Sequence, residues 1–480
     1  MSEVSKHSFE LGRVRCPTAM IDKWSFLPIL AFVYASIVMP LIAFVYSPPA
    51  TLQSMLQSAV EGQQVHRIFW SAMAASSVVL VMQNRSRIGK LILPPHITCL
   101  LAFLAFAGAS TLWAFKPELS FIRFTQEAML LTSIILPTML APRTADVMRG
   151  LFLCLVIGLI LHVLLGGHPR EGGYFLDKNA LGKFAAIAFL LALHEVLYRG
   201  LRQALGMIAV VIAGIVLYLT NSKTSIHLAY VAAFLAGFTL MTRKMMRISP
   251  AIVVLIVVTL LVFFRDQVGW FVFHDQTFSS RTIIWDFVFY EIGRRPLLGW
   301  GYHSFWLVGP DGPSLVDGLG WVKLMPNAHN GYLDTMLELG PVGLALLVIV
   351  IMTTLHAIGR VANRDPARAW VMLSLAIFMI FHNLLETSWM HGTELGWMTF
   401  ALVAAETGRS WRLCQPTKVT HGSRPSTPTS PAFPDGRGTL TLTRIAPQNS
   451  RAKTQMSGPG NLRVRPHRHK QHAGRPRSVR

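Results

Sequence analysis

One short stretch, residues 325–343, holds side chains that could do acid–base chemistry at the edge of a membrane. His329 and Asn330 precede an apolar helix, and two acids, Asp334 and Glu338, lie inside that helix. Imidazole titrates near neutral pH, so His329 could take a proton from an attacking hydroxyl. The two acids are four residues apart and therefore share one helix face. Ionisable groups in a membrane usually serve a function, so this stretch is the first candidate for a site.

These residues could instead have a purely structural role. A histidine at a helix end can serve only as a hydrogen-bonding group, and Asn330 can do no more than cap the helix. Glu338 is expected about two turns inside the membrane, where an unpaired carboxylate is costly. We therefore expect Glu338 to have a partner.

Cationic side chains elsewhere in the chain could stabilise negative charge on phosphate oxygens. Arg281 is the first candidate, because a guanidinium can bind phosphate oxygens in a bidentate fork. Lys178 and Lys223 could add point charges. The alternative for Arg281 is an ion pair with Glu338 or Glu386. Such a pair would also orient the arginine, so the two interpretations are compatible.

Membrane helices are the elements that must position these groups. The chain has 480 residues, of which 52% are hydrophobic and 14% charged, whereas soluble domains are about a quarter charged. A crossing needs roughly 20 apolar residues, which predicts an all-α integral membrane protein with a bundle of about 12 transmembrane helices. The expected helices cover residues 26–46, 67–83, 97–115, 120–141, 149–166, 180–198, 203–220, 224–241, 248–265, 331–357, 369–386 and 392–408.

Basic residues set the expected orientation. They concentrate in alternate loops, namely 83–96, 142–148, 199–202, 242–247 and 358–368. The positive-inside rule makes these loops and both termini cytoplasmic. The long loop 266–330, between the ninth and tenth helices, is then periplasmic. The sequence thus predicts a multi-pass protein of the bacterial inner membrane.

The two ends of the chain differ from the membrane domain, 26–408. Residues 1–25 form a polar cytoplasmic segment and lack the pattern of a cleavable signal peptide. Residues 409–480 hold 15 Lys or Arg against one acid, and their composition predicts a disordered cytoplasmic tail. This tail could contact anionic lipid or be a solvated extension. Its basic residues do not alternate with aromatic residues along the tail, so we predict no nucleic-acid partner. The four scattered cysteines predict neither a metal site nor a disulfide framework.

Polar features from five separate loops fall on the predicted periplasmic side, which indicates a shared site. They are residues 172–179, 221–224, 280–302, 325–343 and 382–388. The third contains Trp285 and Tyr302, whose flat faces suit sugar rings or the lipid interface.

The motifs in these loops resemble those of the bacterial O-antigen ligase and Wzy-type polysaccharide polymerase superfamily, in order along residues 26–408. The matching residues are Lys178-Asn179, Ser222-Lys223-Thr224, Arg281 with Trp285, 296–301, His329-Asn330 with 338–343, and 383–386. The run 281–306 looks most like rhizobial exopolysaccharide production proteins of the ExoQ type. The ligase form of the histidine motif ends in Thr-Glu, where this chain has Leu344-Ala345.

The resemblance implies a membrane glycosyltransferase. The sequence contains no Walker motif and no Asp-x-Asp metal site, so we expect the enzyme to be metal-independent and to need no cofactor. It would polymerise undecaprenyl-pyrophosphate-linked oligosaccharide repeat units into exopolysaccharide at the periplasmic face of the inner membrane. The implied catalytic residues are His329 and Arg281. Pyrophosphate or glycan would be bound by Lys178, Asn179, Ser222, Lys223, Asn330, Trp285 and Tyr302, with Glu338 and Glu386 in support. Membrane lipid, a flippase and a chain-length-regulating copolymerase are the implied partners.

Two alternatives remain at this point. One is an O-antigen ligase that transfers lipid-linked glycan to lipid A core, which differs only in the acceptor. The other is a lipid-linked-sugar transporter. Transporters place polar groups near the bilayer midplane and often contain inverted repeats. The clustering of polar groups at one face and the absence of a visible repeat argue against a transporter.

Overall fold

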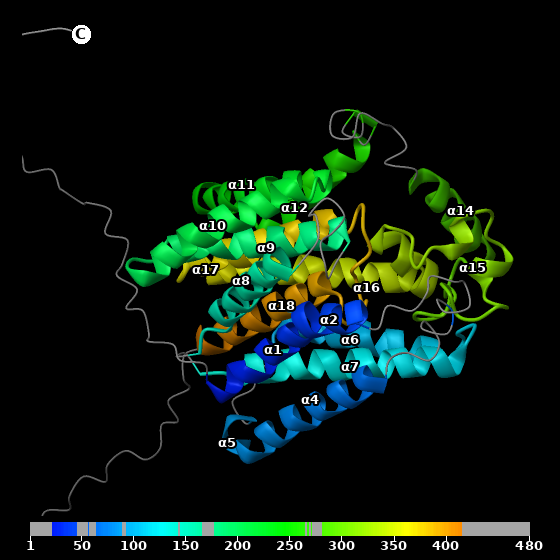
Figure 1. Ribbon diagram of the computed structural model, residues 1–480, viewed down its shortest axis with the longest axis horizontal. Helices are drawn as coiled ribbons and strands as arrows, with labels where there is room; N and C mark the ends of the chain where they lie inside the picture. The colour runs from blue at the N-terminus through cyan, green and yellow to red at the C-terminus, as the bar shows by residue number, and fades with distance from the viewer. Residues whose placement is uncertain are drawn as a thin grey trace, which may run out of the picture. The chain divides into compact units, whose positions relative to one another are not determined.

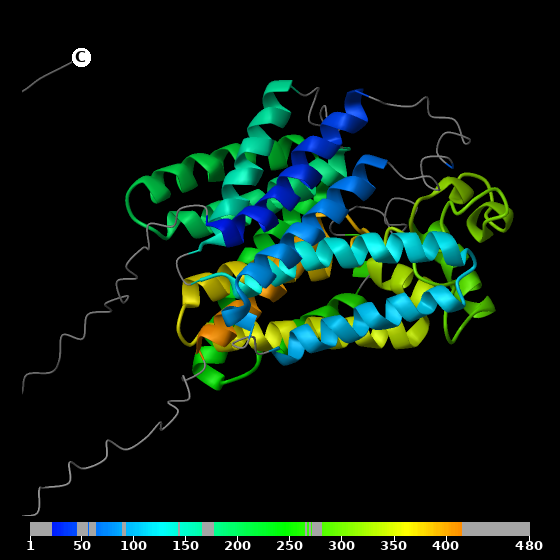
Figure 2. The ribbon, with the colours of Figure 1, turned by 90° about the horizontal axis from the view of Figure 1, so that it is seen from below.

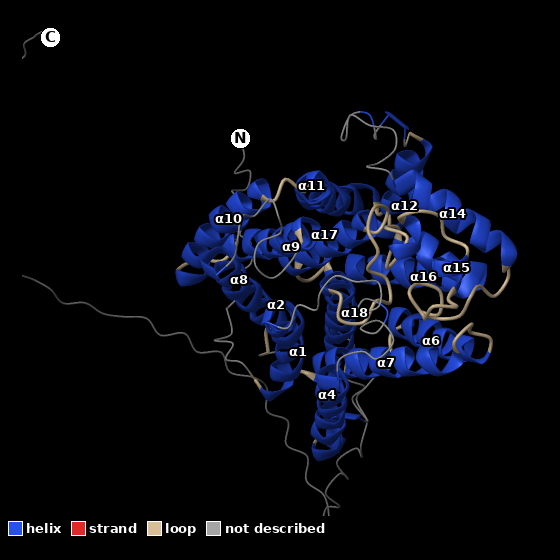
Figure 3. Ribbon diagram, turned by 45° about the vertical axis from the view of Figure 1, so that its right-hand side comes forward, coloured by secondary structure: helices blue, strands red, loops and turns tan. Residues whose placement is uncertain are grey.

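The computed structural model describes residues 22–45, 64–88, 93–142, 145–165, 177–264 and 281–414, together with 56, 266–267 and 270. These residues belong to one compact unit, 1–417. Every regular element in the described segments is a helix (Figure 3). The predictions for residues 1–21, 172–176 and 415–480 lie outside the described residues.

Figures 1 and 2 show the helices from two directions, coloured by their order along the chain. Their bounds are α1 Lys23–Val33, α2 Met39–Val45, α4 Gln64–Gln83, α5 Arg85–Ile88, α6 Pro95–Ala109, α7 Pro117–Leu140, α8 Val147–Leu165, α9 Lys178–Val196, α10 Leu201–Leu219, α11 Lys223–Met246, α12 Pro250–Phe263, α14 Arg281–Arg294, α15 Pro313–Val316, α16 Gly331–Val361, α17 Pro366–His382 and α18 Leu395–Cys414. A π-helical turn, Tyr34–Val38, joins α1 to α2.

Each predicted span overlaps a helix. Within the described segments, nine helical stretches are long and apolar enough to cross a membrane, and α12 and α17 are shorter apolar helices. The chain is a multi-pass helical membrane protein, while the count of twelve crossings stays a prediction. Several predicted boundaries were wrong by four or more residues. Helix α17 ends at His382 rather than 386, and α6 ends at Ala109 rather than 115. Helices α11 and α16 continue to Met246 and Val361, and α18 continues to Cys414, beyond the predicted start of the tail at 409.

Helix α17 forms the centre of the core. It packs against α9, α11, α16 and α18, and residues 371–381 are buried without interruption. This helix is apolar all round, and such a helix is stable only where other helices cover every face. Its C-terminal end is therefore held firmly, and the polar loop that follows it is delivered to a fixed position.

A break in α16 joins the loop 297–301 to the bundle. Gly340 has φ +65° and is followed by Pro341, which lacks an N–H and cannot bond the carbonyl of Leu337. The loop supplies the missing donors, since Trp300 N donates to Leu337 O at 3.0 Å and Gly301 N donates to Glu338 O at 2.8 Å. The proline break in the helix thus becomes a docking point for the loop.

Candidate functional site

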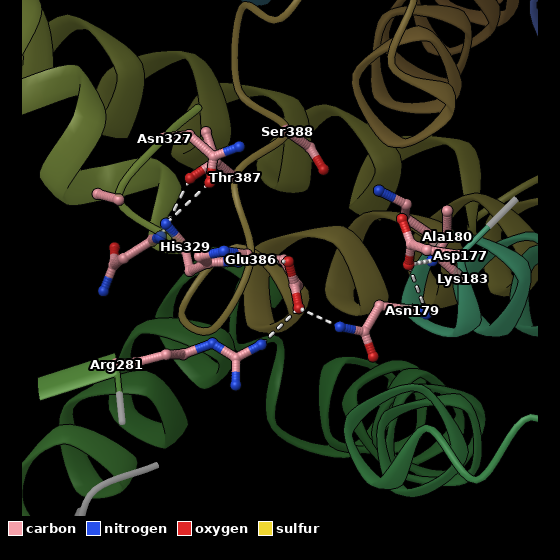
Figure 4. Close-up of polar contacts among 12 residues, drawn as sticks. Asp177, Asn179, Ala180, Lys183, Arg281, Asn327, His329, Glu386, Thr387 and Ser388 are labelled. Atoms are coloured by element: carbon pink, nitrogen blue, oxygen red, sulfur yellow. Dashed lines mark hydrogen bonds and ion pairs between the residues drawn. The ribbon is translucent and has the colours of Figure 1, made fainter. Parts of the chain in front are cut away.

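Glu386 is the point at which four helix ends meet. Its Oε1 accepts a hydrogen bond from Arg281 Nη2 at 2.6 Å and from Asn179 Nδ2 at 3.2 Å. Its Oε2 lies 3.1 Å from His329 Nδ1. Arg281 begins α14, Asn179 lies in the first turn of α9, and His329 precedes α16. Figure 4 shows these side chains pointing toward the carboxylate.

Capping residues fix two of these helix starts. The Asp177 side chain accepts from the N–H groups of Asn179 and Ala180, so it begins α9 and sets the position of Asn179. The Asn330 side chain accepts from the N–H groups of Tyr332 and Leu333 and caps α16, as one sequence interpretation predicted.

His329 is held in an unusual backbone conformation. Its φ is +49°, a region that non-glycine residues rarely adopt. Its N–H donates to Asn327 Oδ1 at 2.9 Å, which compensates part of the cost. Backbone strain of this kind persists where the surroundings dictate the geometry, and it is often found at functional sites.

A buried network ties the loop carrying Glu386 to α16. Thr387 Oγ1 donates to Asp334 Oδ2 at 2.6 Å and accepts from Asn330 N at 3.0 Å. Asp334 also accepts from Trp306 Nε1 at 2.8 Å and from Ala328 N at 3.0 Å. Asp334 is therefore fully satisfied, and it fixes the residues on both sides of His329.

The charges at Glu386 favour its ionised form. Burial alone would raise the pKa of Glu386, but the hydrogen bond from His329 and the positive charge of Arg281 lower the pKa from 4.5 to about 2. A carboxylate only accepts, so His329 Nδ1 must carry the proton in this contact. The remaining ring nitrogen, Nε2, has no hydrogen-bond partner among the described residues, and the His329 side chain is 28% exposed.

Comparisons with known proteins support one superfamily. Residues 208–348 match the family described as O-antigen ligase. The chain is 25% identical to the exopolysaccharide production protein ExoQ of Rhizobium meliloti over 286 residues, which are 53% of this chain and 63% of ExoQ. Provisionally named polysaccharide ligases of Rickettsia bellii and Rickettsia prowazekii are 31% and 33% identical over 23% of this chain and 29% of each relative. The chain thus spans less than two thirds of the length of these relatives. The resemblance to the O-antigen ligase and Wzy-type superfamily is confirmed.

The superfamily motifs are brought together only in part. Asn179, Arg281 and His329 meet at Glu386, and Lys178 is exposed beside Asn179 at the start of α9. The family match covers Arg281 and His329, whereas Asn179 and Glu386 lie outside it.

The Ser222–Lys223 motif lies at the turn before α11. Ser222 is buried, donates to Ser225 Oγ at 3.1 Å and packs against Gly182 of α9, while Lys223 is exposed. No contact joins this turn to Glu386 among the described residues. Its position is set by packing against α9, the same helix that carries Asn179.

Two predicted sugar-stacking aromatics have structural contacts. Trp285 Nε1 donates to Ala328 O at 3.1 Å, so it fixes the backbone beside His329. Tyr302 is 1% exposed and donates to Met390 O at 2.7 Å. Glu338 has the partner that was expected, because its Oε2 accepts from His303 N at 3.0 Å.

Sequence reasoning missed several charged or polar residues near these elements. Lys183 of α9 forms an ion pair with Glu394, and Arg123 of α7 donates to His303 O at 2.5 Å. A signal was present for both, since a lysine and an arginine inside apolar helices require a reason. No group of three metal-ligating side chains is found in the described part of the chain; metal independence stays a prediction.

Proposed function

We propose that this protein is a membrane glycosyltransferase that polymerises undecaprenyl-pyrophosphate-linked oligosaccharide repeat units into exopolysaccharide. The observation that carries the proposal is the shared carboxylate of Glu386, which holds Arg281 and His329 side by side. Similarity to ExoQ, named for exopolysaccharide production, supports the choice of product.

In the proposed reaction, His329 acts as general base. Glu386 holds Nδ1–H, so Nε2 is oriented to take the proton from the attacking sugar hydroxyl. The hydroxyl oxygen bonds to the anomeric carbon of the donor, and the bond from that carbon to the pyrophosphate oxygen breaks. The lipid pyrophosphate leaves with the bonding electron pair. Asn330 acts indirectly, by fixing the start of α16 next to this base.

Arg281 would stabilise the charge that develops on the leaving pyrophosphate. Glu386 fixes the guanidinium in place before substrate binds, and such preorganised charge lowers the barrier without a cost during reaction. Exposed Lys178 and Lys223 lie at the N-termini of α9 and α11, where the helix dipoles add to the attraction for anions.

The proposal includes an orientation and partners. The helix ends around Glu386 would face the periplasm, with both termini in the cytoplasm and the donor carried by membrane lipid. A flippase would deliver the donor, and a copolymerase would regulate chain length.

An O-antigen ligase is the second candidate, favoured by the O-antigen ligase family match and by the names of the Rickettsia relatives. Leu344-Ala345 in place of Thr-Glu favours the polymerase. Both enzymes would use the same donor chemistry and differ in the acceptor.

The test is complementation of a deletion strain with wild type, His329→Ala or Arg281→Ala. Matched controls are His227→Ala and Arg199→Ala, because both residues are exposed and lie on other elements. We expect both site variants to lose long polymer, with repeat-unit material remaining and lipopolysaccharide unchanged, at equal membrane levels. Loss of lipopolysaccharide decoration would instead establish the ligase. Normal products from both site variants would refute the proposed chemistry.

A further inference from the structure

A polar pocket of about 290 Å³ lies beside α16, just before its break at Gly340. It is lined by Arg123 and Gln126 of α7, by Glu338 of α16, and by Trp306 and His391 from the loops. None of these residues contacts Glu386. The pocket is at the lower end of the size range for small-molecule sites.

Three polar groups in this pocket lack a hydrogen-bond partner among the described residues. They are the side-chain amide of Gln126, the ring nitrogens of His391 and Oε1 of Glu338, since Glu338 bonds His303 N through Oε2 only. Burial lowers the pKa of His391 to about 4, so this imidazole is neutral and offers one donor and one acceptor. Gln126 and His391 are half-buried, and together with Glu338 they present both hydrogen-bond donors and acceptors to a ligand in the pocket.

The pocket places one basic side chain near one acidic side chain. Arg123 interacts electrostatically with Glu338, and His303 is neutral because burial lowers its pKa well below the usual value. This contrasts with the basic surroundings of Glu386, where Arg281 and exposed Lys178 lie. Such a pocket with an indole wall suits a neutral polyhydroxylated ring better than a phosphate.

The pocket is linked to the centre at Glu386. Its wall residue Trp306 donates to Asp334, and Asp334 accepts from Thr387, the residue after Glu386. One continuous set of hydrogen bonds therefore fixes both the pocket wall and the residues around His329. A ligand in this pocket would be held at a set position relative to the base.

We propose that the pocket formed by Gln126, His391, Glu338 and Trp306 binds a neutral sugar residue of the glycan substrate. This inference rests on the proposed function, and it assigns glycan recognition to residues of α7 and the 383–394 loop. Gln126 and His391 would hydrogen-bond sugar hydroxyls, and Trp306 would contact the ring.

The test measures binding of the free oligosaccharide, without its pyrophosphate, to the purified full-length protein by calorimetry. The probe is the repeat unit released by mild acid from the lipid that accumulates in the deletion strain. Gln126→Leu removes the amide at similar volume and should weaken binding about tenfold. Gln126→Trp should abolish binding by filling the space. Gln83→Leu is the matched control, because Gln83 is exposed on α4, and its affinity should equal that of wild type.

Each outcome distinguishes this inference from the proposed function. Equal binding by wild type and Gln126→Trp, at unchanged melting temperature, would overturn the pocket assignment while leaving polymerisation intact. The assignment would also be overturned if the wild type failed to bind the oligosaccharide at about 10 mM. A third contrary result would be that inorganic pyrophosphate competes with the oligosaccharide for the wild type but not for Gln126→Leu. A wild type that binds oligosaccharide but makes neither polymer nor ligated product would refute the function alone.

Discussion

Glu386 carries one negative charge that a guanidinium, an imidazole and an amide share. Sequence reasoning placed it in a supporting position and offered it as one of two partners for Arg281. The structure places it within hydrogen-bond distance of three predicted site residues, Arg281, His329 and Asn179. A residue in this position acts through others, by fixing where the base and the cation lie.

Glu386→Gln should lower kcat by roughly 10² to 10⁴, because the amide can no longer accept from both partners as an anion. Affinity for the free oligosaccharide should stay unchanged, since that ligand would contact other residues. The measurement is steady-state kinetics with purified lipid-linked donor. Glu118→Gln, at an exposed position on α7, is the control. A fall in both kcat and the affinity for the free oligosaccharide would contradict a positioning role, and so would no fall in either.

The lowered pKa of Glu386 also predicts a pH dependence of stability. Folding lowers the pKa of Glu386 from 4.5 to about 2, so the unfolded chain binds the carboxyl proton more tightly than the folded chain does. The stabilisation is therefore fully present above about pH 4.5 and is lost as the pH falls toward 2. We expect the difference in melting temperature between wild type and Glu386→Gln to shrink from about pH 6 to about pH 3. A constant difference over that range would show that the charge adds no stability.

At the scale of elements, the break in α16 decides where the loop 297–301 binds. A Cβ on Gly340 would lie 2.3 Å from Leu297 O, and φ there is +65°. A Cβ on Gly299 would lie 2.6 Å from the carbonyl oxygen of Glu338. Two backbones therefore approach each other at distances that only glycine permits.

Gly340→Ala should destabilise the protein by about 2–4 kcal/mol, from strain and displaced backbone. The measurement is the melting temperature in detergent, together with the amount of protein in the membrane. Gly293→Ala is the matched control, because a Cβ there meets nothing within 4 Å, and it should be neutral. Equal stability of the two variants would mean that the loop can shift without cost.

The sequence located the helices because crossing a membrane needs a long apolar run, and each such run became a helix. It failed at the end of α17, where the apolar pattern continues through Leu384 and Leu385. The helix ends because the Asn383 side chain accepts from Ser388 N and Trp389 N and so turns the chain. The sequence also identified the motifs that contain Asn179, Arg281, His329 and Glu386, which the structure brings together. The pairing of Lys183 with Glu394, or of Arg123 with His303, depends on which helix faces oppose, and one sequence does not reveal that.

At the scale of the whole molecule, a buried ionic network joins helices distant in sequence at the end of the bundle away from Glu386. Arg368 Nη2 lies 2.8 Å from Glu406 Oε1 and 3.2 Å from Asp146 Oδ1, and Arg409 Nη2 lies 2.5 Å from Glu406 Oε1. Arg202 extends it to Asp146 at 3.5 Å. Glu406 is fully buried between two arginines. Removing it leaves two cations without this acceptor.

Glu406→Gln should therefore cost about 3–5 kcal/mol of stability, seen as a lower melting temperature in detergent. The kcat of the molecules that remain folded should be unchanged, because the network contacts no site residue. Glu118→Gln again controls for loss of a carboxylate. An unchanged melting temperature would show that the arginines find other partners.

The contacts of Glu386 also bear on how the protein is made. Asn179, Arg281 and His329 leave the ribosome before residue 386 does, and the carboxylate that gathers them comes from near the end of the membrane domain. A chain that stalls before α17 is complete thus has the base and the cation but nothing to hold them together. On the proposed function, unfinished copies would be inert toward lipid-linked sugar.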